Sequence, residues 1–339
     1  MDVSPRYAVV FFNRACPREC GYCRSRLVRV GRLLGPAEWI RAFEILRDHG
    51  VRFTMVLGNE VLTYPWIVEL TRMLRENGFY GSYALYTTFP EPWYSRLRER
   101  LVEAGLYNIS AGVDVVAGAV PDRHITEKSI VGLEGLIWFK EHGVPDVHAT
   151  VTIHRHNYRR LHEVARAATR HRIWTIYSLV GYSPDGLHDF YGTRDELADF
   201  LIDDPNDFAR WMNWFADLVE LGVYAVQSPP QYFRELARVG GEPTRLHCSL
   251  PLTISVEADG TLRLCGYRPF YGEGRRHSVF ELGSKISMDD YVRWWREEAA
   301  RCPGCGWVCW YMAELWHSID PTFGDEVFRR HASRFFSGW

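Results

Sequence analysis

The chain has 339 residues, 47% of them hydrophobic, and its 40 basic and 42 acidic residues give a formal net charge of -2. This length predicts one large α/β domain with a smaller extension, and the near-zero charge excludes bulk nucleic-acid binding, which needs excess lysine and arginine. The sequence contains no run of about eighteen apolar residues and therefore predicts no membrane span. The N-terminus lacks a signal-peptide pattern, so we expect a cytoplasmic protein.

Apolar runs alternate with amphipathic stretches from the N-terminus to about residue 180. Short apolar runs predict strands, and apolar residues three and four apart predict helices. Six strands alternating with helices require parallel pairing, so we expect an α/β fold whose sheet is open or curled into a partial barrel. The predicted strands are 7–12, 53–57, 82–88, 107–113, 148–153 and 174–180, and the predicted helices are 36–49, 66–77, 93–104, 128–142 and 162–171.

The sequence changes character after residue 180. Residues 185–207 are acidic and contain several glycines and prolines, which predicts an inserted surface segment, and an amphipathic helix follows at 208–221. Residues 254–265 alternate around an Asp-Gly turn, which predicts a β-hairpin. We therefore expect a barrel at 1–182, a helical bridging segment at 183–244 and a C-terminal module at 245–339.

Three cysteines, Cys16, Cys20 and Cys23, lie within eight residues after the first predicted strand. Thiolates are soft ligands, and so compact a set favours an iron-sulfur cluster or zinc over a place in a hydrophobic core. Structural zinc normally takes four protein ligands, and no Cys or His follows within twenty residues of Cys23. A cluster held by three cysteines leaves one iron open to a small molecule.

The other five cysteines follow residue 245. Cys248 and Cys265 stand before and at the end of the predicted hairpin, and Cys302, Cys305 and Cys309 form a compact second group. Four thiolates can converge here, and tetrahedral zinc explains this second set as well as a cluster does. A chain of this length does not need disulfide staples, so a reducing compartment fits the eight cysteines better.

The Cys-x3-Cys-x2-Cys spacing, with Tyr22 before the last cysteine, resembles the signature loop of the radical S-adenosylmethionine (SAM) superfamily. The resemblance implies a partial (β/α)6 barrel whose loop holds a 4Fe-4S cluster on Cys16, Cys20 and Cys23, with SAM on the open iron. It also implies reductive cleavage of SAM to a 5'-deoxyadenosyl radical, which removes hydrogen from a substrate C-H bond. The residues that resemble the family's SAM contacts are Tyr22, Gly58, Asn59, Glu60, Thr88 and Asp114, while Gly112 replaces a serine and Asn157 closes the fifth strand.

The late cysteines are similar to the SPASM/Twitch extension of this superfamily, because Cys248, Gly260 and Cys265 keep its order and spacing. The resemblance implies a small module, a β-hairpin plus helices, with a second, auxiliary 4Fe-4S cluster. The implied ligands are Cys248, Cys265, Cys302 and Cys305. Cys309 is then a candidate hydrogen-atom donor, or it replaces Cys302 or Cys305 as a ligand.

The resemblance implies an enzyme of oxidoreductase or epimerase type that dehydrogenates or epimerises a small polar substrate, a sugar or an aminocyclitol. Only fifteen residues precede Cys16, which leaves no room for a leader-peptide domain, so modification of a ribosomally made peptide by crosslinking or epimerisation is the alternative. A non-enzymatic iron-sulfur carrier or zinc scaffold is the alternative of another class. We also expect an electron donor such as flavodoxin or ferredoxin. The basic cluster of His154, Arg155 and His156 is expected to be a solvated strand end, the alternative being a site that holds the SAM carboxylate or an acidic substrate.

Overall fold

The structure is a computed structural model that describes residues 5–24, 31–57, 59–116, 118, 120–186, 189–245, 253–263, 265, 276–302 and 304. Four residues of the predicted sites, Gly58, Cys248, Cys305 and Cys309, lie outside the described residues.

An eight-stranded sheet forms the centre of the molecule, in the order β6-β5-β4-β3-β2-β1-β7-β8. The first six strands pair in parallel with their neighbours in sequence, and a helix connects each consecutive pair. This arrangement confirms the α/β class and the six predicted strands. The strands are β1 (Tyr7–Phe11), β2 (Phe53–Leu57), β3 (Tyr83–Thr87), β4 (Asn108–Gly112), β5 (Asp146–Ile153), β6 (Trp174–Leu179), β7 (Thr253–Val256) and β8 (Leu262–Arg263).

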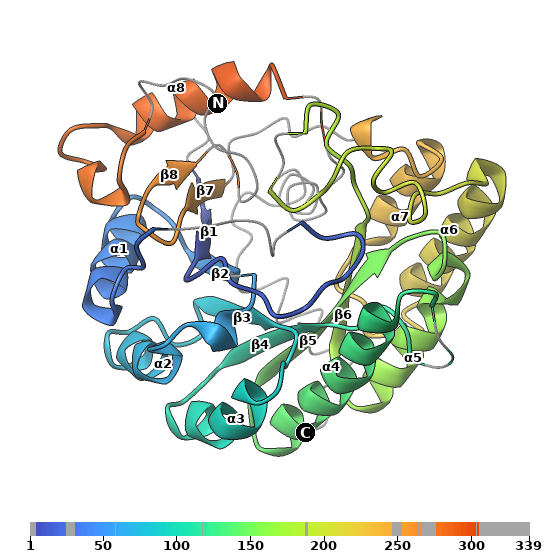
Figure 1. The fold of residues 1–339 in the computed structure, drawn as a ribbon, viewed down its shortest axis with the longest axis horizontal. Coiled ribbons are helices and arrows are strands. Elements are labelled where there is room, and N and C mark those ends of the chain that lie inside the picture. Colours follow the sequence, from blue (N-terminus) through green and yellow to red (C-terminus); the bar gives the residue numbers. More distant parts are fainter. Residues whose placement is uncertain are drawn as a thin grey trace.

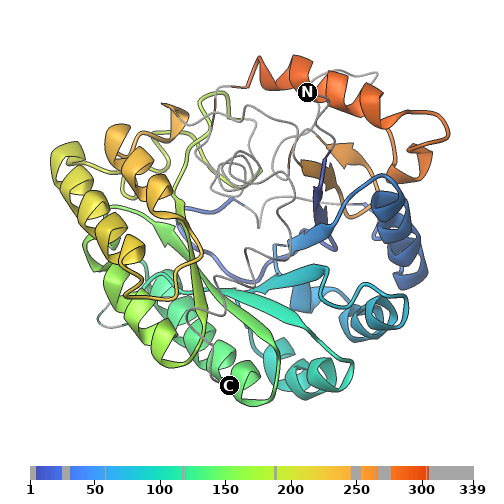
Figure 2. The same ribbon diagram turned by 180° about the vertical axis from the view of Figure 1, so that it is seen from behind.

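Helices cover the outer side of the curved sheet, as Figures 1 and 2 show from opposite directions. Strand residues such as Val10, Leu85 and Ile109 face these helices and form the main core with Leu46 and Leu136. The strands have continuous apolar sequences because parallel strands that are covered by helices are buried on both faces. The helices are α1 (Pro36–Asp48), α2 (Ile67–Glu76), α3 (Trp93–Glu103), α4 (Arg123–Glu141), α5 (Leu161–Arg170), α6 (Pro205–Glu220), α7 (Pro230–Arg238) and α8 (Met288–Ala299).

Helix starts follow local capping signals. Pro36 takes the first position of α1, and the Gly35 amide donates to Glu38 Oε2 at 2.9 Å. Helix α4 begins at Arg123, five residues before the predicted start, because Asp122 accepts from the amide of His124 at 2.8 Å. None of the helices in the described part of the chain is long and apolar enough to span a membrane.

The predicted hairpin is present, and it extends the central sheet. β7 and β8 pair antiparallel, and β7 also pairs in parallel with β1, with Tyr7 opposite Thr253. Gly260 adopts φ +89° in the turn, a conformation that favours glycine. Tyr291 of α8 donates its hydroxyl hydrogen to the Arg263 carbonyl at 3.0 Å. Helix α8, which ends shortly before Cys302, is therefore fastened to the hairpin.

The acidic segment at 185–207 has the exposed charged side chains that its composition predicts, but it also has a buried apolar side. Within its described part, Tyr191 and Leu197 are buried. They share a hydrophobic cluster with Cys20 and Tyr22, and Phe200 packs against this cluster. In Figure 1 the segment, in yellow-green, lies on the inner side of the curved sheet. It therefore packs onto the three-cysteine loop.

Candidate active site

The three-cysteine loop follows β1 and crosses the inner side of the sheet (Figure 1). Cys20 is buried and Cys16 half-buried, both as free thiols, and the Cys23 amide donates to the Cys20 carbonyl at 2.9 Å. Burial raises the pKa of the Cys16 thiol, and it raises the pKa of Cys20 to about 11. Such thiols become thiolates when a metal takes the place of the proton, so this donor set fits a cluster.

Single metal ions need a tighter ligand arrangement than a cluster, in which each cysteine binds a different iron. No three His, Cys, Asp or Glu side chains among the described residues have the spacing for a single bound ion.

Tyr22 lies at the centre of a buried polar network beneath the loop. Its hydroxyl donates to Asp114 Oδ2 at 2.7 Å and accepts from Lys128 Nζ at 2.5 Å. Lys128 Nζ also donates to Asp114 Oδ2 at 2.8 Å. All three side chains are less than 5% exposed. The loop is thus fixed to the end of β4 and to α4.

Asp114 is held in its charged form by its surroundings. Burial favours a higher pKa for its carboxyl, but the charges of Lys128 and His154 and the hydrogen bonds from Lys128 and Thr152 together lower the pKa. The amide of Thr152 donates to Asp114 Oδ1 at 2.8 Å, and the side-chain amide of Asn157 donates to the Asp114 carbonyl at 3.1 Å. Asn157 therefore joins the ends of β4 and β5, which is where the resemblance expects it.

Glu60 is fully buried between the ends of β2 and β3. Its Oε1 accepts from the Thr87 hydroxyl at 2.6 Å and the Leu62 amide at 3.0 Å. Its Oε2 accepts from the amide of Thr88 at 2.6 Å and from its hydroxyl at 2.7 Å. Burial raises the pKa of Glu60 despite these hydrogen bonds. The carboxylate thus acts as a brace that holds Thr88 and the loop after β2 together.

Two further contacts bring these residues to the cysteine loop. The side-chain amide of Asn59 donates to the Arg14 carbonyl, two residues before Cys16. Arg18, inside the loop, donates from Nη2 to the Thr88 carbonyl at 3.1 Å. The loop after β2 and the end of β3 therefore flank the cysteines.

The strand end at His154 is not solvated as predicted. His154 is fully buried, and burial lowers its pKa to about 4. Its ring lies 6.1 Å from Tyr22 and 5.8 Å from Phe200, measured between centroids. Arg155 does reach the surface, where it pairs with Asp203 at 2.5 Å.

Of the late cysteines, Cys265 and Cys302 lie within the described residues. Cys265 packs on the inner side of the sheet against the cluster formed by Val9, Phe11 and Leu57. Cys302 follows α8, and its amide donates to the Ala299 carbonyl at 3.1 Å.

A buried ionic network connects the cysteine loop, the hairpin and the acidic segment. Arg14 binds Glu257 through two nitrogens, with Nε to Oε1 at 2.8 Å and Nη2 to Oε2 at 2.7 Å. Arg263 binds both Glu257 and Asp189. Burial favours a higher pKa for Glu257, but the two arginines lower it to about 2. The network thus anchors Asp189 beside the residues that precede Cys16 and Cys265.

The inner face of the sheet has an apolar and a polar half. Over β1 to β3 it carries Val9, Phe11 and Leu57, which Phe190 covers. Over β4 to β6 the register places Ser110 beside His148, and Ser178 beside Thr152. The Ser110 and Ser178 hydroxyls are buried and have no hydrogen-bond partner among the described residues. An amphipathic ligand would match this division.

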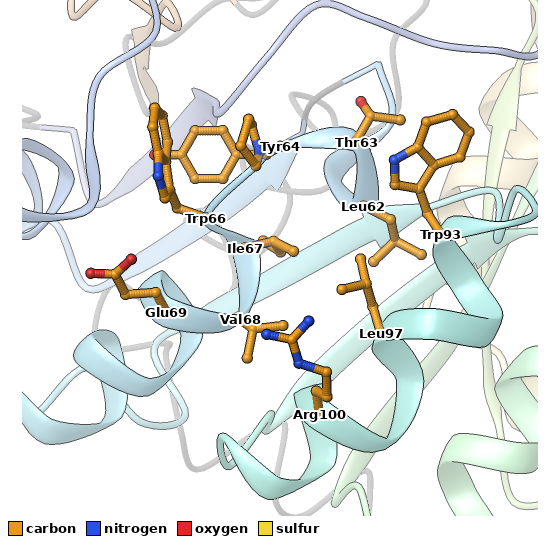
Figure 3. Close-up of a pocket in the computed structure, with 11 residues that line it drawn as sticks. Leu62, Thr63, Tyr64, Trp66, Ile67, Val68, Glu69, Trp93, Leu97 and Arg100 are labelled. Atoms are coloured by element: carbon orange, nitrogen blue, oxygen red, sulfur yellow. The ribbon is translucent and has the colours of Figure 1, made fainter.

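A separate pocket of about 280 Å³ lies outside this site, between the start of α2 and α3 (Figure 3). Trp66 and Trp93 stand at opposite sides of it, and Leu97 and Arg100 lie between them. None of the predicted site residues lines it.

Sequence reasoning missed Lys128, Glu257 and Phe190. A lysine within an amphipathic helix usually predicts a solvated position, and no local pattern marks Lys128 as buried. One signal was available, because the chain has only three lysines among its 40 basic residues.

The comparisons with known proteins agree with this geometry. Residues 10–168 match the family model of the radical SAM superfamily. Among solved structures, the chain is similar to Streptococcus suis SuiB bound to S-adenosylmethionine, with a TM-score of 0.62 at 15% identity over 85% of this chain and 66% of that one. It is also similar to SuiB alone, with a TM-score of 0.60 at 14% identity over 85% and 66% of the two chains.

SuiB bound to the precursor peptide SuiA matches with a TM-score of 0.58 at 15% identity, over 85% of this chain and 65% of that one. The match thus covers about 66% of the length of the SuiB chain, both in SuiB bound to S-adenosylmethionine and in SuiB alone. At these identities the likeness shows a shared fold, and the family match identifies the domain that carries the cysteine loop. The domain formed by residues 10–168, which carries the cysteine loop, belongs to the radical SAM superfamily.

Proposed function

We propose that this chain is an enzyme that binds SAM and a 4Fe-4S cluster at the three-cysteine loop and abstracts hydrogen from a substrate C-H bond. The observation that carries the proposal is the loop itself, whose buried or half-buried thiols adjoin the Tyr22–Asp114–Lys128 network. Cys16, Cys20 and Cys23 each bind one iron, which leaves one iron for SAM. SAM bound to a reduced cluster supplies the radical that removes hydrogen.

The chain's own residues position SAM and keep water away. Tyr22 holds the loop in place through its hydrogen bond to Asp114. Asp114 and Thr88 place polar atoms at the ends of β4 and β3. By resemblance to the family, Asn59 and Gly58 would contact the methionine part of SAM. Glu60 fixes these positions through its four internal hydrogen bonds. Phe190 and Phe200 of the acidic segment exclude water from the loop.

A second 4Fe-4S cluster of the SPASM/Twitch type would use Cys248, Cys265, Cys302 and Cys305. Cys265 supports this reading because it lies on the inner face, on the side of the sheet that the three-cysteine loop crosses. Such a cluster would accept an electron from a substrate radical or bind the substrate. Cys309 is the proposed hydrogen-atom donor if the reaction is an epimerisation.

The substrate that we favour is a peptide, modified by crosslinking or epimerisation. The apolar half of the inner face can pack against an apolar or aromatic side chain of a substrate. The packing of Phe190 on Val9, Phe11 and Leu57 shows that an aromatic ring fits this surface. The fold is similar to that of SuiB, which one structure records with its precursor peptide.

A sugar or aminocyclitol, dehydrogenated or epimerised, is the second candidate. The unpartnered hydroxyls of Ser110 and Ser178 favour it, since a polyhydroxylated ligand would supply their missing hydrogen bonds. In either case the cluster needs a low-potential electron donor such as flavodoxin or ferredoxin, and a reducing compartment such as the cytoplasm suits its thiols.

Anaerobic reconstitution followed by iron and sulfide analysis tests the cluster assignment. We expect about eight irons per chain for the wild type and about four for Cys20→Ala, which retains the auxiliary cluster. Adding SAM and a reductant should release 5'-deoxyadenosine from the wild type and none from Cys20→Ala. Zinc without iron, or clusters without SAM cleavage, would overturn the proposal.

The substrate class is tested by SAM cleavage in the presence of cell-extract fractions separated by ultrafiltration. A peptide substrate stimulates cleavage in a protease-sensitive manner, whereas stimulation by a sugar survives protease treatment.

A further inference from the structure

Lys128 is the buried cation of the Tyr22–Asp114 network at the cysteine loop. It lies on α4, is 4% exposed, and donates to Tyr22 at 2.5 Å and to Asp114 at 2.8 Å. Placing an ammonium group out of water is costly, and one carboxylate partner offsets the cost only in good geometry. A buried lysine therefore calls for an explanation beyond stability.

The choice of lysine at this position is itself informative. The chain uses arginine for almost all of its 40 basic residues and contains only three lysines. Lysine carries a compact point charge, whereas the planar guanidinium of arginine needs a wider site. Lys128 thus brings a concentrated charge into a narrow space.

Two glycines make that space. A Cβ atom at Gly112 would lie 3.1 Å from Lys128 Nζ and 3.2 Å from its Cε. A Cβ atom at Gly132, on α4 itself, would lie 2.6 Å from the Gly112 carbonyl oxygen. The glycine at 112, where the family resemblance expects a serine, therefore allows α4 to approach β4 and lets the ammonium group reach the loop.

Lys128 contacts the loop itself. Its Nζ donates to the hydroxyl of Tyr22, which stands between Cys20 and Cys23 in the sequence, and lies 5.2 Å from the centroid of the Tyr22 ring. The buried ammonium group is therefore next to the segment that carries two of the three proposed cluster ligands.

We propose that Lys128 is a positioning residue that holds Tyr22 and the loop in place and whose positive charge raises the reduction potential of the cluster on Cys16, Cys20 and Cys23. The inference rests on the proposed function, since it requires a cluster at this loop. A nearby cation stabilises the additional electron of the reduced cluster, and local charge and hydrogen bonding are established determinants of cluster potential.

The test is a redox titration monitored by electron paramagnetic resonance, following the signal that changes when SAM is added. The Lys128→Met variant should have a more negative midpoint potential than the wild type, because the substitution removes a buried positive charge that contacts the loop. Asp114→Asn should shift the potential in the opposite direction. Lys128→Arg, which keeps the charge, should stay closer to the wild type than Lys128→Met.

Lys140→Met is the matched control, because it removes the same charge from the last turn of α4, about 18 Å away along the helix. It should leave the potential unchanged. A fully loaded Lys128→Met protein with the wild-type potential overturns the inference and leaves the proposed function intact. If the Lys128→Met protein does not hold iron, the Asp114→Asn variant is the decisive test. A midpoint potential of Asp114→Asn that is not higher than that of the wild type overturns the inference. Wild-type protein without iron would instead refute the proposed function.

Discussion

The carboxylate of Glu60 shows how one residue organises the site without facing solvent. It accepts four hydrogen bonds from three residues, and these residues belong to the loop after β2 and to the end of β3. A buried carboxylate with all of its partners in place rigidifies its surroundings.

Replacing Glu60 with Gln should therefore be strongly destabilising. One oxygen becomes an NH2 group that faces hydrogen-bond donors, which leaves buried polar groups unsatisfied and lowers the free energy of unfolding by about 1–3 kcal/mol. Urea unfolding measures the loss. Glu69→Gln, at an exposed position of α2, is the control and should change little. Equal stabilities of the two variants would contradict the bracing role.

At the residue scale, the sequence indicates candidate ligands more clearly than the residues that support them. The cysteine spacing and the residues that resemble SAM contacts stand out because their chemistry requires those residue types. The role of Lys128 depends on glycines at 112 and 132 and on a tyrosine in a different segment. Such a network arises only when distant parts of the chain meet.

The acidic segment after β6 is the element whose structure differs most from its composition. Negative charges and turn residues predict a solvated insertion, but its aromatic residues turn inward. The Phe200 ring lies 5.7 Å from Tyr22, 5.8 Å from His154 and 5.9 Å from His156, measured between centroids. Charged side chains on one side of an irregular segment conceal an apolar side, because no regular period marks it.

Phe200→Ala should consequently loosen the cysteine loop. Losing the ring should lower the free energy of unfolding by about 3 kcal/mol and speed the release of iron to a chelator, which absorbance can follow. Glu196→Gln is a suitable control in the same segment, since it removes an exposed ion pair with Arg24 and should have little effect. If the two variants lose iron at the same rate, Phe200 does not cover the loop.

The ionic network of Arg14, Glu257, Arg263 and Asp189 operates at the scale of the whole molecule. It connects the chain before Cys16, the hairpin and the segment after β6. Arg14 and Arg263 are buried, so their charges depend on the two carboxylates.

This network predicts a specific dependence of stability on pH. The pKa of Glu257 falls from 4.5 to about 2 on folding. Because the ionised Glu257 carboxylate is more favourable in the folded state than in the unfolded state, it stabilises the folded protein above pH 4.5. This stabilisation is lost as the pH falls from 4.5 toward 2. Wild type and Glu257→Gln should differ by about 3 kcal/mol at neutral pH, and the difference should shrink toward pH 2. Denaturant unfolding at several pH values measures it, and a constant difference would exclude this role.

Much of the fold is readable from the sequence, for a physical reason. Parallel strands covered by helices are apolar on both faces, so β1 to β6 appear as short apolar runs, and the Asp-Gly turn marks the hairpin. The pairing of β7 with β1 is different, because backbone hydrogen bonds between distant segments leave no local pattern. Helix α7 is a different case, because it is not among the predicted helices although Tyr232, Phe233, Leu236 and Ala237 recur at helical spacing.

That pairing has a consequence for electron flow. β1 leads into the three-cysteine loop, β7 leads into the turn before Cys265, and the two strands are adjacent in the sheet. A shift of one residue between them would turn the side chains of the hairpin to the opposite face. Strand register therefore sets where Cys265 stands relative to the three-cysteine loop. In the proposed two-cluster enzyme, this fixed register would let an electron pass between the centres without any domain movement.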